Sequence, residues 1–196
     1  KPIPSVTDII SPLHRSYGKI NPAVLDQAAR RGTAVHEALE MMDYGADFEV
    51  FPETAPYIMA YQDWAEVYRP TWTGIEEIVF CEEGWYAGTL DRIGMLNGNE
   101  LAIVDIKTST PNRESYVSVC LQTMAYAMAY SSQRKFNPSW EEISRYGLFL
   151  MKDGNYRCIN CKEWEGTNHI DSGNAFATLL GTHKMVNKLL ETRGKK

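Results

Sequence analysis

The stretch "LAIVDIKTST", residues 101–110, begins as an apolar β-strand and ends with two charges. The strand formers Ile103, Val104 and Ile106 surround Asp105, and Lys107 follows Asp105 by two residues. Side chains alternate across a strand, so Asp105 and Lys107 share one face while Ile106 points to the other. A surface ion pair on an edge strand and a metal-dependent active site both account for this pattern.

The preceding strand supplies a second carboxylate. We expect strands at 74–80 and 85–96, with "NGN" as the turn between the second strand and 101–107. If that turn is centred on Gly98, Asp91 lies directly opposite Asp105, where like charges destabilise a sheet. A bound divalent cation reverses this effect, because hard cations prefer carboxylate oxygens. The pairing therefore favours a metal site over a simple ion pair.

A third carboxylate is expected from the first hairpin. If its turn is centred between Glu83 and Gly84, Glu76 faces Asp91. A shift of one residue would bring Glu77 there instead, and we favour Glu76. Carboxylates, a divalent cation and a lysine such as Lys107, which can stabilise negative charge on a phosphate, form a metal-assisted phosphodiesterase site.

The rest of the chain predicts helices around this three-stranded meander. Helical spacing and caps predict a short helix near Ser5 or Thr7 and helices at about 21–45, 54–70, 115–130 and 172–191. Two more strands, "RYGLFLM" and "YRCINCK", flank a turn at Asp153-Gly154. The order predicts an α/β (α+β) fold with a mixed, mainly antiparallel central sheet. We expect one domain over 1–196, with N-terminal helices in 1–70, the catalytic sheet and helix in 74–130, and C-terminal strands and a helix in 145–191.

Composition narrows the class of protein. The chain has 196 residues, 44% of them hydrophobic, which is typical of a globular protein. The net charge of −5 and the pI of about 5.4 count against a protein that coats nucleic acid by bulk electrostatics, but not against an enzyme with a local site. No apolar run reaches the ~18–20 residues of a membrane helix, and the N-terminus lacks a signal-peptide pattern, so we expect a cytoplasmic protein without membrane contact.

Four linked motifs then resemble a known family. "YAGTLDRIGML" (86–96), "LAIVDIKTS" (101–109) and "LQTMAY" (121–126), preceded by "RGTAVHEALE" (31–40), are similar to the PD-(D/E)XK nuclease superfamily. The branch is that of RecB-like and phage-type exonucleases, including the CRISPR-associated adaptation nucleases. The resemblance covers about residues 30–130 and implies a restriction-endonuclease-like core.

The resemblance implies a role for the central residues. Asp91 and Asp105 are the expected metal carboxylates, the main-chain carbonyl of Ile106 is a further ligand, and Lys107 is the expected catalytic lysine. His36 resembles the histidine that completes the metal shell, although a lone helical histidine is more often structural.

The flanking residues are assigned in the same way. Glu76 matches the family's acidic position. Gln122 and Tyr126 match its Q-x-x-x-Y motif, which adjoins the site and is associated with orienting the lysine or contacting DNA. Without the family, both would be read as ordinary helix residues. Arg30 and Arg31 could meet phosphates, and a solvated face is an equal alternative.

The implied cofactor is Mg²⁺ or Mn²⁺. Several RecB-like relatives hold an iron–sulfur cluster with four cysteines, one of them early in the chain. Here no cysteine precedes Cys81, and the C-terminal region offers only Cys158 and Cys161, so we expect no iron–sulfur cluster and read these as reduced cysteines.

The expected function is a deoxyribonuclease, most simply a phage or prophage exonuclease that hydrolyses linear DNA through a metal-activated water. It would serve recombination, repair or replication in a bacterial host, with a single-strand annealing or recombination protein as a partner. An endonuclease or flap-type nuclease on the same site, or a non-catalytic DNA-binding module, are the alternatives. The sequence specifies no oligomeric state.

Overall fold

We describe the fold from a computed structural model, which covers residues 2–13, 21–135 and 137–193. The elements are α1 (Val6–Ile10), η1 (Ser11–Leu13), α2 (Pro22–Asp43), α3 (Ala55–Tyr68), β1 (Thr71–Cys81), β2 (Tyr86–Leu96), β3 (Glu100–Lys107), α4 (Arg113–Gln133), η3 (Trp140–Glu142), β4 (Ser144–Leu150), β5 (Tyr156–Asn160), α5 (Cys161–Asn168) and α6 (Ser172–Arg193). Among these residues, no helix is both long enough and apolar enough to cross a bilayer.

The five strands form one mixed sheet in chain order, β1-β2-β3-β4-β5. All neighbours pair antiparallel except β3 and β4, which are parallel and joined through α4. A parallel pair needs such a long crossover connection, whereas the other pairs are hairpins. The predicted mixed, mainly antiparallel sheet flanked by helices is confirmed.

The turn between β2 and β3 sets the register that matters for function. Asn97 and Gly98 both have positive φ values, 49° and 78°, and Asn99 N–H donates to Leu96 C=O at 3.2 Å. This is a type I′ turn, whose twist matches that of the flanking strands. Asn99 adds a third residue to the loop, so Leu96 pairs with Glu100 and Gly98 is at the centre, which confirms the register predicted around Gly98.

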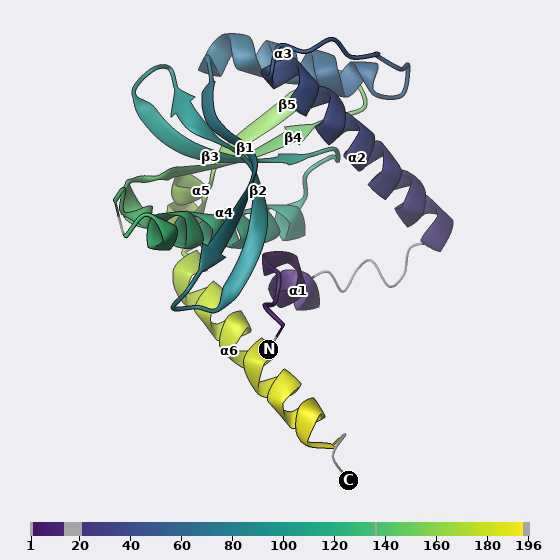
Figure 1. The fold of residues 1–196 in the computed structure, drawn as a ribbon. Helices are drawn as coiled ribbons and strands as arrows, with labels where there is room; N and C mark the ends of the chain where they lie inside the picture. The colour runs from purple at the N-terminus through teal and green to yellow at the C-terminus, as the bar shows by residue number, and fades with distance from the viewer. Residues whose placement is uncertain (1, 14–20, 136, 194–196) are drawn as a thin grey trace.

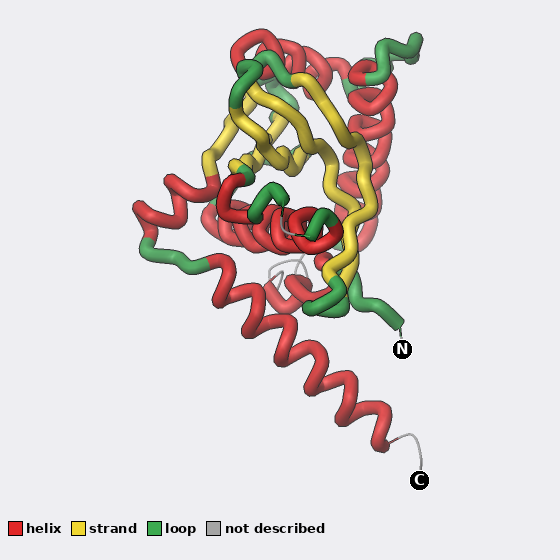
Figure 2. Tube along the Cα trace, turned by 60° about the vertical axis from the view of Figure 1, so that its left-hand side comes forward, coloured by secondary structure: helices red, strands yellow, loops and turns green. Residues whose placement is uncertain are grey.

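Helices cover both faces of the sheet (Figures 1 and 2). Ala102, Val104 and Ile106 of β3 belong to the core beneath α2 and α3. Ile103 belongs to the core beneath α4, behind which α1 and α6 pack. Because side chains alternate, Asp105 and Lys107 share the face of Ile103 and lie toward α4.

Local sequence signals fix the two helices that carry site residues. α2 begins with Asn21 as its N-cap, with Pro22 in the first turn, and its C-cap residue Tyr44 is followed by Gly45 in the left-handed region. α4 begins with a capping box in which Asn112 and Ser115 satisfy each other's backbone N–H groups. Caps at these ends define where each helix starts, and therefore which residues it turns toward the sheet.

One predicted strand is too long. The segment 156–162 was expected to be a strand throughout, but β5 ends at Asn160 and Cys161 begins α5. Asn160 caps this helix by accepting a hydrogen bond from Glu163 N–H at 3.2 Å. The alternating pattern masked the cap, so α5 was not predicted.

Candidate active site

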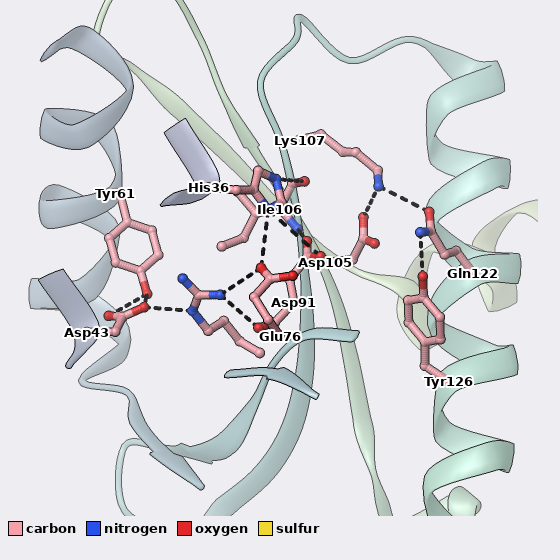
Figure 3. Close-up of polar contacts among 11 residues, drawn as sticks. His36, Asp43, Tyr61, Glu76, Asp91, Asp105, Ile106, Lys107, Gln122 and Tyr126 are labelled. Atoms are coloured by element: carbon pink, nitrogen blue, oxygen red, sulfur yellow. Dashed lines mark hydrogen bonds and ion pairs between the residues drawn. The ribbon is translucent and has the colours of Figure 1, made fainter. Parts of the chain in front are cut away.

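The site lies where β2 parts from β3. Pairing between the two strands ends at Arg92 and Val104, one step before Asp91 would face Asp105. At this point Ile106 N–H donates to Asp91 Oδ2 at 2.6 Å, so a side chain replaces the missing ladder acceptor (Figure 3). The opening holds the two carboxylates near one another without continuous strand pairing between them.

Glu76 reaches the same place from β1. Its neighbours Ile75 and Glu77 pair with Arg92 and Leu90, so Glu76 is level with Asp91, as the predicted hairpin register required. Its φ of 48° lies in the left-handed region, which is strained for a non-glycine residue and is often found at functional sites. Glu77 turns away to Arg134, whose Nη2 lies 2.8 Å from its Oε1. The structure therefore places Glu76, and not Glu77, at the site.

His36 on α2 lies against this group from the other side. Its Nδ1 is 3.5 Å from Glu76 Oε1 and 3.9 Å from Asp91 Oδ1, and its Nε2 is 3.2 Å from the carbonyl oxygen of Ile106. One ligand atom each from His36, Glu76 and Asp91 lies within 4.8 Å of the others, which is compact enough to hold a metal ion. The predicted ligands His36, Asp91, Glu76 and the Ile106 carbonyl are thus brought together.

A second chain of contacts runs from Asp105 to α4 (Figure 3). Asp105 Oδ2 lies 2.6 Å from Lys107 Nζ. Lys107 donates to Gln122 Oε1 at 3.1 Å, and Gln122 Nε2 donates to the Tyr126 hydroxyl at 2.8 Å. Gln122 and Tyr126 are four residues apart and share one face of α4. The lysine is therefore held between a carboxylate and an amide.

The surroundings of Asp105 fit a cation. Its side chain is fully buried, and among the described residues neither of its oxygens accepts a hydrogen bond, although Oδ2 has the ion pair with Lys107. Buried carboxylates are normally hydrogen-bonded, paired or bound to metal, and one lysine leaves most of these acceptor positions unfilled. A divalent ion beside Asp91 would use them.

Charge crowding at the site changes proton affinities. Burial, followed by the charge of Asp105, raises the pKa of Asp91 to about 6. Burial would lower the pKa of His36, but its hydrogen bond with Glu76 and the charge of Asp91 outweigh this and raise it. Burial would raise the pKa of Glu76, but His36 and Arg92 lower it. The raised pKa of Asp91 indicates that too little positive charge surrounds Asp91 and Asp105. A bound cation would supply it.

Sequence reasoning missed a buried arginine network on the opposite side of Asp91. Arg92 is fully buried; its Nε lies 2.7 Å from Asp43 Oδ2 and its Nη1 lies 3.2 Å from Glu76 Oε1. Arg92 Nη1 also donates to the Asp91 carbonyl at 2.8 Å, and Tyr61 donates its hydroxyl to Asp43 at 2.8 Å. Asp43 and Tyr61 lie on α2 and α3, so no strand pattern could have located them.

The predicted DNA contacts are placed as follows. Arg30 is exposed and pairs with Asp26 at 3.0 Å, and the Arg31 guanidinium lies 5.8 Å from the centre of the Tyr57 ring. Neither joins the cluster around Asp91. Tyr126 is only 3% exposed, so its main contact at the site is with Gln122.

A cleft gives access to the site. It has a volume of about 470 Å³ and lies between α2 and the end of β3. His36, Glu76, Ile106 and Lys107 form part of its wall. A substrate entering this cleft would meet the candidate metal ligands and the lysine together.

Comparison with known proteins agrees with this geometry. The family model of the PD-(D/E)XK nuclease superfamily matches residues 52–157, which is more than half of the chain and includes β1 to β4 and α4. His36 precedes the matched region. Among curated proteins, no significant match was found.

Proposed function

The chain belongs to the PD-(D/E)XK nuclease superfamily, and on this premise we propose that it is a divalent-metal-dependent exonuclease acting on linear DNA. The nuclease class and the restriction-endonuclease-like fold follow from the family match and from the mixed five-stranded sheet flanked by helices. The exonuclease activity is supported by the resemblance of the motifs at 86–96, 101–109 and 121–126 to those of phage-type exonucleases.

The observation that carries the proposal is the pairing of Asp105 with Lys107 next to Asp91. Asp91, Asp105, His36 and the Ile106 carbonyl would hold Mg²⁺ or Mn²⁺, both of which accept oxygen ligands. Glu76 would contribute less, because it is already shared between His36 and Arg92. When bound, the ion would polarise the scissile phosphate and lower the pKa of a water.

The protein's own groups would do the rest. The Lys107 ammonium, fixed by Asp105 and Gln122, is directed to stabilise the negative charge that develops on the phosphate. The ammonium of Lys107 can only donate, so it takes the amide oxygen of Gln122, and Tyr126 accepts from the amide nitrogen and holds the side chain in this orientation. This orientation keeps Lys107 in place before the substrate arrives, which is the sense in which such sites are preorganised.

We propose a setting in bacterial cytoplasm, with the protein encoded by a phage or prophage. Removal of nucleotides from DNA ends would serve recombination, repair or replication, and the exposed single strand would pass to an annealing or recombination protein. The support for this setting is the family resemblance of the motifs.

A digestion assay tests the proposal. End-labelled linear DNA, single- and double-stranded, and covalently closed circles are incubated with Mg²⁺, Mn²⁺ or EDTA. We expect linear DNA to be shortened from its ends only when metal is present, and Asp105→Asn to remove both cleavage and metal binding measured by calorimetry. Cutting of circles would identify an endonuclease instead. No cutting of any DNA, with Lys107→Ala indistinguishable from the parent, would identify a non-catalytic module.

A further inference from the structure

A second groove lies at the far end of the β1–β2 hairpin from the active site. Its volume is about 370 Å³, and its described walls include Pro4 of the N-terminal segment, Trp85 of the hairpin turn, and His183, Lys184 and Lys188 of α6. We call it the Trp85 groove. None of its described wall residues is acidic. Trp85 is six residues from Asp91, a span of roughly 20 Å along an extended strand.

Trp85 is held in an unusual position. Its side chain is 45% exposed, and its φ of 50° lies in the left-handed region, where a bulky residue is an outlier. The adjacent Gly84 would adopt this conformation more easily. The indole and the Phe80 ring are nearly perpendicular, with ring centroids 5.6 Å apart and planes at 79°. Such strain is typical of positions where the side chain itself is used.

Positive charge is concentrated at this end of the chain. Residues 183–196 contain five Lys and Arg and one acidic residue, Glu191, for a net charge of +4. The preceding 182 residues contain the other 15 basic and 24 acidic residues, for a net charge of −9. Of these basic residues, Lys184 and Lys188 line the groove, and they can attract a polyanion locally on an acidic protein.

The wall residues of α6 occupy one face of the helix. At 100° per residue, His183, Lys184, Asn187 and Lys188 fall together, and the exposed Met185, Val186, Leu189 and Leu190 fall on the opposite side. Asn187 Nδ2 lies 2.9 Å from His183 Nε2, which joins two members of the polar face. The basic face therefore belongs to the groove, and α6 carries it outward from the body of the protein (Figures 1 and 2).

An acidic side chain near the groove would repel a polyanion. Glu83 belongs to the same hairpin turn as Trp85, but its Oε2 accepts a hydrogen bond from Ser132 of α4 at 2.6 Å. This contact draws the carboxylate toward α4. Glu83 is not among the described residues that line the groove.

We infer that the Trp85 groove binds single-stranded DNA, with a base stacked on the indole and phosphates beside Lys184 and Lys188. An aromatic face next to paired cations is the arrangement that single-stranded nucleic acid uses, because every base can stack and every phosphate is anionic. The inference rests on the proposed function, since it gives the strand that enters or leaves the active site a second point of attachment.

Binding is measured without cleavage, by fluorescence anisotropy of a labelled oligothymidine in EDTA. An oligonucleotide of about 20 nucleotides exceeds the site size of typical single-strand binding folds. Trp85→Ala should weaken binding about tenfold, whereas Trp85→Tyr, which keeps a stacking ring, should stay close to the parent. Lys184→Glu with Lys188→Glu should lower the salt-dependence slope by about 1.4, because each lost phosphate contact on a single strand contributes ~0.7.

A matched pair controls for net charge. Lys152→Glu with Lys162→Glu changes the charge equally on exposed residues outside the groove, and it should alter affinity less than about twofold, as distant charges are screened. Melting temperatures verify that each variant folds. Parent-like affinity in both groove variants, an equal loss in the control pair, or no binding by the parent would overturn the inference. So would lysine-dependent binding to vesicles of anionic lipid with unchanged DNA affinity, which would make the groove a membrane contact.

The two proposals fail separately. If only the groove is misassigned, its variants lose no DNA affinity while metal-dependent digestion persists. If only the nuclease proposal is wrong, no DNA is cut, yet the oligonucleotide still binds in EDTA through Trp85 and the two lysines. With both correct, the groove variants should raise KM for long DNA and leave kcat near the parent value.

Discussion

Arg92 and Lys107 are two cations that flank the same pair of aspartates, and they differ in almost every other respect. Arg92 is fully buried and contacts two carboxylates, those of Asp43 and Glu76, together with the Asp91 carbonyl. The Lys107 side chain is 32% exposed, lines the cleft, and contacts the Asp105 carboxylate and the amide of Gln122. Arg92 lies on β2 and contacts Asp43 of α2, whereas Lys107 lies on β3 and contacts Gln122 of α4.

These differences indicate that Arg92 supports the fold, whereas Lys107 is accessible to a substrate. A guanidinium with several rigid donors suits a buried ion-pair network, whereas an ammonium on a flexible stem can move its charge toward a substrate. The cation that a reacting phosphate can meet is therefore Lys107. Arg92 instead joins β2 to α2 through Asp43 and also pairs with Glu76.

Lys107→Ala tests the catalytic side and should have the largest effect. Loss of a preorganised charge at the reacting phosphate should lower the single-turnover cleavage rate by about 10²–10³-fold. The melting temperature in EDTA should fall as well, because the buried Asp105 carboxylate loses its ion-pair partner, so the rate is compared at a temperature where both proteins are folded. Lys152→Ala, at an exposed lysine in the β4–β5 turn, is the control. A rate within threefold of the parent would remove Lys107 from the mechanism.

Arg92→Gln tests the structural side. Removing one partner of a buried ion pair leaves Asp43 and Glu76 uncompensated, and such losses cost about 3–5 kcal/mol of unfolding free energy. Denaturant unfolding in EDTA measures this, with Arg30→Gln as the control because its ion pair with Asp26 is on the surface. If Arg92→Gln unfolded like the parent but lost cleavage, the assignment of the two cations would have to be reversed.

The same contrast explains what could be predicted from the sequence. The Asp91–Asp105 register was predictable because the loop Asn97-Gly98-Asn99 is centred on Gly98, and strand geometry then places residues equally distant from Gly98 opposite each other. Lys107 followed from alternation along β3. These are local rules, and each needs only a few neighbouring residues.

The Arg92 network follows no local rule. Asp43 and Tyr61 meet Arg92 only because α2 and α3 pack across the sheet, with Trp64 stacked between Tyr68 and Trp72. His36 has the same dependence, since α2 sets its position, and it was predicted from the family resemblance and not from spacing. The missed α5 shows the opposite problem, in which the local alternation at 156–160 concealed the Asn160 cap.

Metal binding should depend on pH through Asp91. Its pKa of about 6 in the folded protein lies above the ordinary value of ~3.9. In EDTA, its ionisation should therefore lower the free energy of unfolding as pH rises from about 4 to about 6. Mn²⁺ binds only the ionised form of the Asp91 carboxylate, so the affinity for Mn²⁺ should fall about tenfold from pH 7 to pH 5.

Calorimetry and melting curves at several pH values measure both effects. His36, whose pKa is raised above 6.5, titrates at higher pH and provides an internal contrast. Asp91→Asn should remove the fall in stability between pH 4 and pH 6 and move the histidine step to lower pH, because the charge of Asp91 contributes to the raised pKa of His36. An unchanged fall in that variant would assign the titration to another group.

Tyr126→Phe should have the smallest effect on the cleavage rate, and it tests whether Tyr126 acts through Lys107. The substitution removes the acceptor of the Gln122 amide without opening a cavity, and a lost hydrogen bond of about 1 kcal/mol corresponds to roughly a fivefold lower rate. If Gln122 acts only by orienting Lys107, Tyr126→Phe and Lys107→Ala should not add, because the double variant has no lysine to orient. Cleavage rates of the three variants form a double-mutant cycle. Additive losses would mean that Tyr126 acts independently of Lys107, and the contact chain from α4 would then be part of the fold in the same sense as the Arg92 network.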